Sequence, residues 1–151
     1  MEKHIDYTAI APDGFKAMIS LEAYVRRSGL EQSLLELIKI RVSQINGCAY
    51  CIDMHTKDAR AAGESEQRLY ALPAWRETPF FTARERVALA WAEALTGVLN
   101  KRVPDSLREE TLRSFSEKEL IDLTFGIVTI NGWNRLAISF RTPPGSYQPG
   151  Q

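Results

Sequence analysis

The residues best suited to chemistry lie within eight positions, from Cys48 to His55. The chain has only two cysteines, Cys48 and Cys51, three positions apart, and one of its two histidines, His55, follows four positions later. On a helix these three side chains would share one face. The Cα atoms of a helical i,i+3 pair lie about 5–5.5 Å apart, within the roughly 4.4–6.8 Å that a disulfide accepts. An imidazole with an ordinary pKa near ~6.5 can accept a thiol proton, so the pattern indicates a redox-active cysteine pair.

Other interpretations of the same residues remain open. If Cys48 opens a helix, the first-turn N–H groups and the helix dipole would lower its pKa. Cys48, Cys51 and His55 could instead bind a structural zinc ion, but zinc requires a fourth ligand and the other histidine, His4, is distant in sequence. The thiols could also be buried and unreactive. We expect no cofactor, because there is no glycine-rich phosphate loop or dinucleotide fingerprint.

Charge and hydropathy exclude several classes of partner. Lys+Arg and Asp+Glu both number 19, so the formal net charge is zero and neither nucleic acid nor an anionic membrane is favoured. No apolar run approaches the roughly 20 residues that span a bilayer, and the N-terminus lacks the apolar region of a secretory signal. We therefore expect a cytoplasmic protein. In a reducing compartment a CxxC motif is more often redox-active or metal-binding than a structural disulfide.

The apolar pattern predicts an all-α protein. Apolar residues recur at helical spacing, and no convincing run alternates with period two. Capping boxes at Thr82–Glu85 and Ser116–Glu119 should open two of the helices. Within the last helical segment, the Asn131-Gly132 pair predicts a kink or a break. The predicted helices cover a segment after residue 14 and the approximate ranges 31–46, 48–63, 66–72, 82–96, a segment after residue 105, and 116–140.

These elements fit one domain. At 151 residues with 44% apolar and 25% charged residues, the chain can bury a real core and has the composition of ordinary globular proteins. We expect a single-domain bundle of six to eight helices over residues 1–151, with its core at about 31–140. The polar, proline- and glycine-rich tail at 142–151 is expected to be loosely ordered.

A glutamate on the preceding helix extends the candidate site. Glu36 interrupts the predicted helix at 31–46, whose apolar residues cover most of its circumference and indicate burial on nearly every side. A buried carboxylate without a partner is costly, and a hydrogen bond to His55 would satisfy it. An ion pair with Lys39, or with an arginine such as Arg60, is the alternative.

The four residues together resemble a known family. Glu36 precedes Cys48 by twelve positions, and with Cys51 and His55 it matches the spacing of the alkyl hydroperoxidase D-like branch of the carboxymuconolactone decarboxylase superfamily. The resemblance extends over about residues 31–140. Further similar segments are LPAWR at 72–76, FFT at 80–82, ERVALAW at 85–91 and NGWNR at 131–135.

The resemblance implies an all-helical fold assembled as a homo-oligomer, such as a trimer or hexamer. It also implies a peroxidase that reduces hydroperoxides at the expense of an external dithiol or protein reductant. Glu36 and His55 would form a proton relay, Cys51 would attack the peroxide, and Cys48 would resolve the sulfenic acid into a disulfide. The dipole argument alone favours Cys48 as the thiol with the lower pKa.

One departure and two alternatives accompany this resemblance. Tyr50 stands where the most studied members have a histidine, which removes one potential base and puts the strength of any peroxidase activity in question. A lyase acting on a lactone acid, as in the decarboxylase branch, would not depend on the cysteine pair. A non-catalytic redox-sensing or zinc-stabilised module is the remaining hypothesis.

Overall fold

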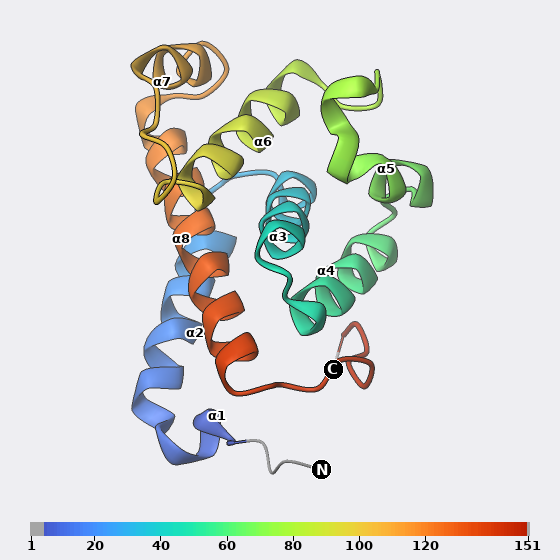
Figure 1. Ribbon diagram of the computed structural model, residues 1–151, viewed down its shortest axis with the longest axis vertical. Coiled ribbons are helices and arrows are strands. Elements are labelled where there is room, and N and C mark those ends of the chain that lie inside the picture. The colour runs from blue at the N-terminus through green and yellow to red at the C-terminus, as the bar shows by residue number, and fades with distance from the viewer. Residues whose placement is uncertain (1–4, 151) are drawn as a thin grey trace.

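The computed structural model describes residues 5–150, which form eight α-helices, one 3₁₀ helix and no strand (Figure 1). The predicted all-α class is therefore confirmed. No helix in this described part is long and apolar enough to cross a bilayer. The elements are α1 (Tyr7–Ile10), α2 (Pro12–Arg26), α3 (Gln32–Asn46), α4 (Ala49–Ala61), α5 (Glu66–Ala71), η1 (Leu72–Glu77), α6 (Ala83–Thr96), α7 (Asp105–Thr111) and α8 (Glu117–Ser139).

Helix α3 lies at the centre of the fold, where α4, α6 and α8 pack against it (Figure 1). Its apolar side chains cover most of its circumference, as the sequence indicates, and they make up much of the core. Burying α3 on several sides carries its polar residues into the interior, which is how Glu36 and Lys39 come to lie inside the protein. The buried apolar residues of α3 are Leu34, Leu35, Leu37, Ile38, Ile40 and Val42.

Gly47 and Cys48 connect α3 to α4. Gly47 adopts the left-handed conformation, with φ of 71°, which favours glycine because a side chain would be strained there. Cys48 follows with an extended backbone, and its N–H donates to the carbonyl of Ser43 at 3.0 Å. Cys48 is therefore the N-cap of α4, one position before the helix, and Cys51 lies in the first turn.

Both predicted capping boxes are present. The Thr82 hydroxyl accepts from the N–H of Glu85, whose carboxylate accepts from the N–H of Thr82, and Ser116 and Glu119 repeat this arrangement. Each box satisfies two N–H groups that the first helical turn leaves without partners. Helices α6 and α8 consequently begin where the sequence predicts.

The predicted break at Asn131-Gly132 is wrong, because α8 is continuous from Glu117 to Ser139. The Asn131 amide donates to the carbonyl of Ile127 at 2.9 Å and to the Thr96 hydroxyl at 3.2 Å. A Cβ atom on Gly132 would lie 3.0 Å from Cε of Met18. The pair thus supports close tertiary packing of α8, where the sequence pattern suggested a kink or a break.

The C-terminal tail, which comes after α8 in the sequence, lies alongside α4. Residues 142–150 form no helix or strand, and the sequence predicts loose order there. Hydrogen bonds nevertheless connect this segment to α4: the N–H of Gly145 donates to Asp53 at 3.0 Å, and the Tyr147 hydroxyl donates to Asp58 at 2.6 Å. Lys57 also donates to the Tyr147 carbonyl at 3.1 Å. The tail therefore lies against the helix that carries the cysteines.

Candidate active site

The two cysteine sulfurs are in direct contact at the N-terminus of α4. Both are free thiols, at most 2% exposed, and their Sγ atoms lie 2.7 Å apart. The backbone N–H of Cys51 also points at Sγ of Cys48, at 3.4 Å. The two sulfurs thus lie side by side within one helical turn, as the spacing of the cysteines predicts.

The environment separates the pKa values of the two thiols. The hydrogen bond from Cys51 lowers the pKa of Cys48 to about 7, against the effect of burial, and backbone N–H groups and the Asn134 side chain add to the lowering. The hydrogen bond to Cys48 raises the pKa of Cys51, as do burial and the negative charge of Cys48. Above a pH of about 7 the pair therefore holds one proton, with Cys48 as the thiolate and Cys51 as the donor.

Asn134 supports the thiols from α8. It is completely buried, its amide donates to the Ser43 hydroxyl at 3.0 Å, and its oxygen accepts from Asn46 at 2.9 Å. Its side chain lowers the pKa of both cysteines. The sequence offered only its place in the NGWNR segment as a signal, and sequence reasoning did not assign Asn134 to the thiols.

His55 and Glu36 form the predicted pair across α3 and α4. Nδ1 of His55 lies 3.0 Å from Oε2 of Glu36, and His55 is 3% exposed. Burial raises the pKa of Glu36, but the hydrogen bond from His55 and the charges of His55 and Lys39 outweigh burial and lower it. An ionised carboxylate only accepts hydrogen bonds, so Nδ1 carries a proton and Nε2 is the nitrogen where His55 gains or loses one.

The alternative ion pair of Glu36 is present as well. Nζ of Lys39 lies 3.8 Å from Oε1 of Glu36, so the two carboxylate oxygens serve different partners. Lys39 also lies 2.6 Å from Oε1 of Glu22 on α2. Arg60 pairs with Glu66. Sequence reasoning missed Glu22, because no spacing rule connects α2 to the cysteine motif.

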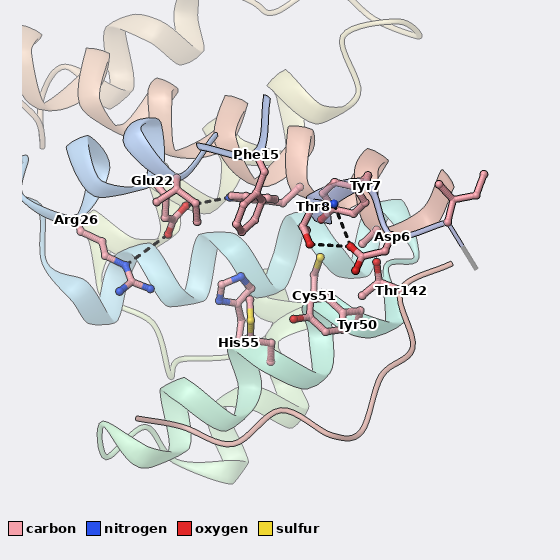
Figure 2. Close-up of a pocket in the computed structure, with 15 residues that line it drawn as sticks. Asp6, Tyr7, Thr8, Phe15, Glu22, Arg26, Tyr50, Cys51, His55 and Thr142 are labelled. Carbon is pink, nitrogen blue, oxygen red and sulfur yellow. Dashed lines mark hydrogen bonds and ion pairs between the residues drawn. The ribbon is translucent and has the colours of Figure 1, made fainter. Parts of the chain in front are cut away.

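Cys51 and His55 open onto a cavity of about 410 Å³ (Figure 2). The thiolate Cys48 is not among the lining residues, whereas Tyr50, the residue between the cysteines, is. Most of the wall is aromatic or aliphatic, and Glu22 and Arg26 lie together at one end (Figure 2). The remaining lining residues are Ile5, Asp6, Tyr7, Thr8, Phe15, Ile19, Met54, Trp133, Ala137 and Thr142.

The geometry gives the zinc hypothesis little support. Within residues 5–150, the ligand atoms of Glu36, His55 and Asp58 come within 4.8 Å of one another, and the cysteines are outside that group. Glu36 and Asp58 already accept hydrogen bonds, from His55 and Tyr147. His4 lies outside the described residues.

Comparison with known proteins shows which family the chain belongs to. A sequence model of the carboxymuconolactone decarboxylase family matches residues 12–94, more than half of the chain. The uncharacterised protein YdfG of Bacillus subtilis is 47% identical over 139 residues, covering 92% of this chain and 95% of YdfG. The structure of ATU0492 from Agrobacterium tumefaciens, a protein of unknown function proposed as the antioxidant defence protein AhpD, matches with a TM-score of 0.92 and 42% identity. That match covers 97% of this chain and all of the other.

A shorter match is to a named enzyme. Over 41 residues the chain is 44% identical to alkyl hydroperoxide reductase AhpD of Bradyrhizobium diazoefficiens, covering 27% of this chain and 22% of that protein. The fold and site define an all-helical protein with a buried dithiol beside a carboxylate–imidazole pair. The chain belongs to the carboxymuconolactone decarboxylase family, in its AhpD-like branch. The resemblance stated from the sequence is confirmed.

Proposed function

We propose that this protein is a thiol peroxidase that reduces organic hydroperoxides through a Cys48–Cys51 dithiol/disulfide cycle. One observation carries the proposal: Cys51 and His55 line the same cavity, while each also contacts a partner, Cys48 and Glu36 respectively. A substrate in the cavity would therefore contact a thiol and an imidazole at the same time. Cys51 has Cys48 beside it to form a disulfide, and His55 has Glu36 beside it to balance a positive charge.

In the first step, the single proton of the cysteine pair moves across the S···S contact to Cys48, which leaves a thiolate at Cys51. This thiolate attacks the distal oxygen of the hydroperoxide, so an S–O bond forms and the O–O bond breaks. Cys51 becomes a sulfenic acid and the alkoxide leaves. His55, as an imidazolium balanced by Glu36, donates its Nε2 proton to the alkoxide, which departs as the alcohol.

In the second step, the sulfur of Cys48 attacks Sγ of Cys51. The S–S bond forms, the S–O bond breaks, and the departing hydroxide takes the Cys48 proton and leaves as water. Two thiols and one hydroperoxide thus yield a disulfide, an alcohol and water. An external dithiol or protein reductant then returns the disulfide to the dithiol, as a reducing cytoplasm could provide. The scheme uses no metal or cofactor.

The order of the two cysteines follows from access. The pKa lowered to about 7 makes Cys48 the resting thiolate, in agreement with the dipole argument. Cys51, however, is the cysteine that lines the cavity. We assign the attack to Cys51 because a substrate can reach it, and resolution to Cys48 because it contacts Cys51 from behind.

Stopped-flow consumption of cumene hydroperoxide with dithiothreitol as reductant tests the proposal. The Cys51→Ser variant should lose the reaction. The Cys48→Ser variant serves as its matched control, since without dithiothreitol it should consume one equivalent of peroxide and stop at the Cys51 sulfenic acid. Full wild-type rates in Cys51→Ser would overturn the proposal.

The cavity supports a bulky apolar substrate. Its volume of about 410 Å³ is far larger than a hydrogen peroxide molecule requires. Phe15, Ile19 and Trp133 give it an apolar lining, which suits an organic group. Burial of an aryl or long alkyl group would add binding energy of ~0.8 kcal/mol per CH₂ group. We expect kcat/KM for cumene hydroperoxide to exceed that for hydrogen peroxide by about tenfold or more, a modest ~1.4 kcal/mol. The reverse preference would contradict this assignment.

Exposed apolar residues on α8 support self-association. Ile121, Phe125 and Val128 are 55%, 42% and 54% exposed and follow the i, i+4, i+7 spacing of one helix face. We propose that this face contributes to a homo-oligomer, such as a trimer or hexamer. Light scattering should give an oligomer for the wild-type protein and a smaller species for Phe125→Glu. A monomeric wild-type protein at micromolar concentration would refute self-association.

Two measurements distinguish the remaining alternatives. Turnover of a lactone acid that persists in Cys51→Ser would favour the lyase. One zinc ion per chain, lost together with the fold on chelation, would favour the zinc-stabilised module.

A further inference from the structure

A buried lysine lies between two carboxylates beside the proposed proton relay. Lys39 is 2% exposed, and its Nζ lies 2.6 Å from Oε1 of Glu22 and 3.8 Å from Oε1 of Glu36. Removing an ammonium group from water costs several kcal/mol unless close partners compensate for it. The two carboxylates provide this compensation, and only one of them, Glu36, contacts His55.

The groups form a chain across four helices. The indole N–H of Trp133 on α8 donates to Oε2 of Glu22 on α2 at 3.4 Å, and the other oxygen of Glu22 contacts Lys39 on α3. Lys39 faces one oxygen of Glu36, and the other oxygen faces Nδ1 of His55 on α4. Charges alternate along this chain, and both of its ends, Trp133 and His55, line the cavity.

We propose that Lys39, held by Glu22, is a positioning residue that keeps Glu36 ionised and so reserves Nε2 of His55 for proton transfer in the cavity. This role rests on the proposed peroxidase function. Lys39 touches no substrate and acts through Glu36 and His55.

The physical reason is the separation of two like charges. The charge of Glu22 raises the pKa of Glu36, whereas the charge of Lys39 lowers it. Without Lys39 the two carboxylates would repel each other, and one of them would take up a proton more readily. A protonated Glu36 can donate to Nδ1, which would move the proton of a neutral His55 imidazole to Nε2.

Three other ionisable groups lie near this chain, and one of them, Arg26, pairs with a member of it. Arg26 on α2 lies 3.6 Å from Glu22, on the cavity side. Asp58 on α4, close to Glu36 and His55, accepts a hydrogen bond from Tyr147 of the tail. Cys51 on α4 donates a hydrogen bond to the sulfur of Cys48. Lys39 is the cation that lies between Glu22 and Glu36.

Two variants should shift the pH dependence in opposite directions. Activity requires an ionised Glu36, so it falls as the pH drops through the pKa of this residue. Lys39→Met raises that pKa, and the acid limb of the rate profile should move up by about one pH unit. Glu22→Gln removes the repelling charge and keeps Lys39 beside Glu36, so the limb should move to lower pH.

Nitrogen-15 NMR of the His55 ring provides a readout that does not depend on peroxidase activity. The spectrum is simple, because the chain has two histidines and His4→Gln removes the other signal. The wild-type protein should show neutral His55 protonated at Nδ1. In Lys39→Met the Nε2-protonated form should appear as the pH falls through the raised pKa of Glu36, and Lys39→Arg should restore the wild-type spectrum.

A control separates this role from simple stabilisation. Lys118 on α8 also pairs with a buried carboxylate, Asp122, although its own side chain is 71% exposed. Lys118→Met should lower stability without moving the acid limb or the His55 signals. If Lys39→Met and Glu22→Gln both keep the wild-type limb and tautomer, Lys39 is only structural and the proposal fails. If Lys39→Met does not fold, the position of the acid limb in Glu22→Gln decides the outcome alone. Absence of peroxidase activity would instead refute the proposed function and leave the NMR test intact.

Discussion

Nδ1 of His55 lies 3.0 Å from Oε2 of Glu36, although 19 positions and the turn at Gly47 separate the two residues. The contact joins α3 to α4, and His55 also lines the cavity. It fixes the ring and leaves Nε2 as the nitrogen that exchanges protons. Each following prediction depends on this contact, on the neighbouring thiols, or on the helices that hold them.

Replacing Glu36 by glutamine should slow the first turnover. The amide side chain of the Glu36→Gln variant could still accept a hydrogen bond from His55, but it would no longer balance an imidazolium. We expect the rate of cumene hydroperoxide consumption in a single turnover to fall about 10²-fold, the scale of acid–base catalysis. Glu64→Gln, which affects an ion pair with Arg68 away from the cavity, is the control. Equal rates in the two variants would remove Glu36 from the mechanism.

The same substitution should change how stability depends on pH. The pKa of Glu36 is lowered in the folded protein, from about 4.3–4.5 in the unfolded chain, so its stabilising contribution is complete above the unfolded value. It is lost as the pH falls through the folded pKa. We therefore compare the unfolding free energies of the wild-type protein and Glu36→Gln. The value for the wild type minus that for the variant should decrease as the pH is lowered from 6 to 3. Urea denaturation measures it, and a difference that stays constant would contradict the assignment.

Asn134 should prove necessary for the low pKa of Cys48. Asn134→Ala removes a hydrogen bond that favours the thiolate, so the pKa of Cys48 should rise above its value of about 7. The pH dependence of alkylation by iodoacetamide reports this change. Asn131→Ala is the matched control, since Asn131 lies on α8 like Asn134 and also accepts a hydrogen bond from Asn46 of α3. An equal shift in both variants would indicate a general disturbance of α8.

Gly132 should tolerate alanine if α8 is continuous. The group nearest to a Cβ atom there is the flexible end of Met18, which can move at little cost. Alanine also favours the helix over glycine by about 1 kcal/mol. We expect the unfolding free energy of Gly132→Ala to be unchanged or up to about 1 kcal/mol higher by urea denaturation. A clear loss of stability would mean that this position needs the conformational freedom of glycine.

The sequence predicted most helices because their signals are local. The capping boxes at Thr82 and Ser116 act within one turn, and Gly47 provides the left-handed residue that ends α3. The Asn131-Gly132 pair misled the local reading because both residues serve contacts from other helices, with Thr96 and Met18. The hydrogen bonds of the tail were not predicted, since they depend on tertiary contacts, and the four-residue helix α1, which Asp6 caps locally, was too short to give a periodic signal.

The same distinction applies to the candidate site. Cys48, Cys51 and His55 are neighbours along one helix, so their spacing revealed them, and the buried position of Glu36 on α3 indicated its need for a partner. Glu22 and Asn134 reach the site from α2 and α8. Periodicity shows that these helices are buried in part, but it does not show which of their polar residues meet the relay or the thiols.

Counting thiols after a single peroxide addition tests the central claim most directly. Reduced protein is mixed with one equivalent of cumene hydroperoxide, and the free thiols are titrated before and after addition of dithiothreitol. The dithiol cycle predicts that both thiols of each chain disappear together and return on reduction, and that Cys48→Ser accumulates a sulfenic acid at Cys51. Consumption of the peroxide with both thiols still free would contradict the account.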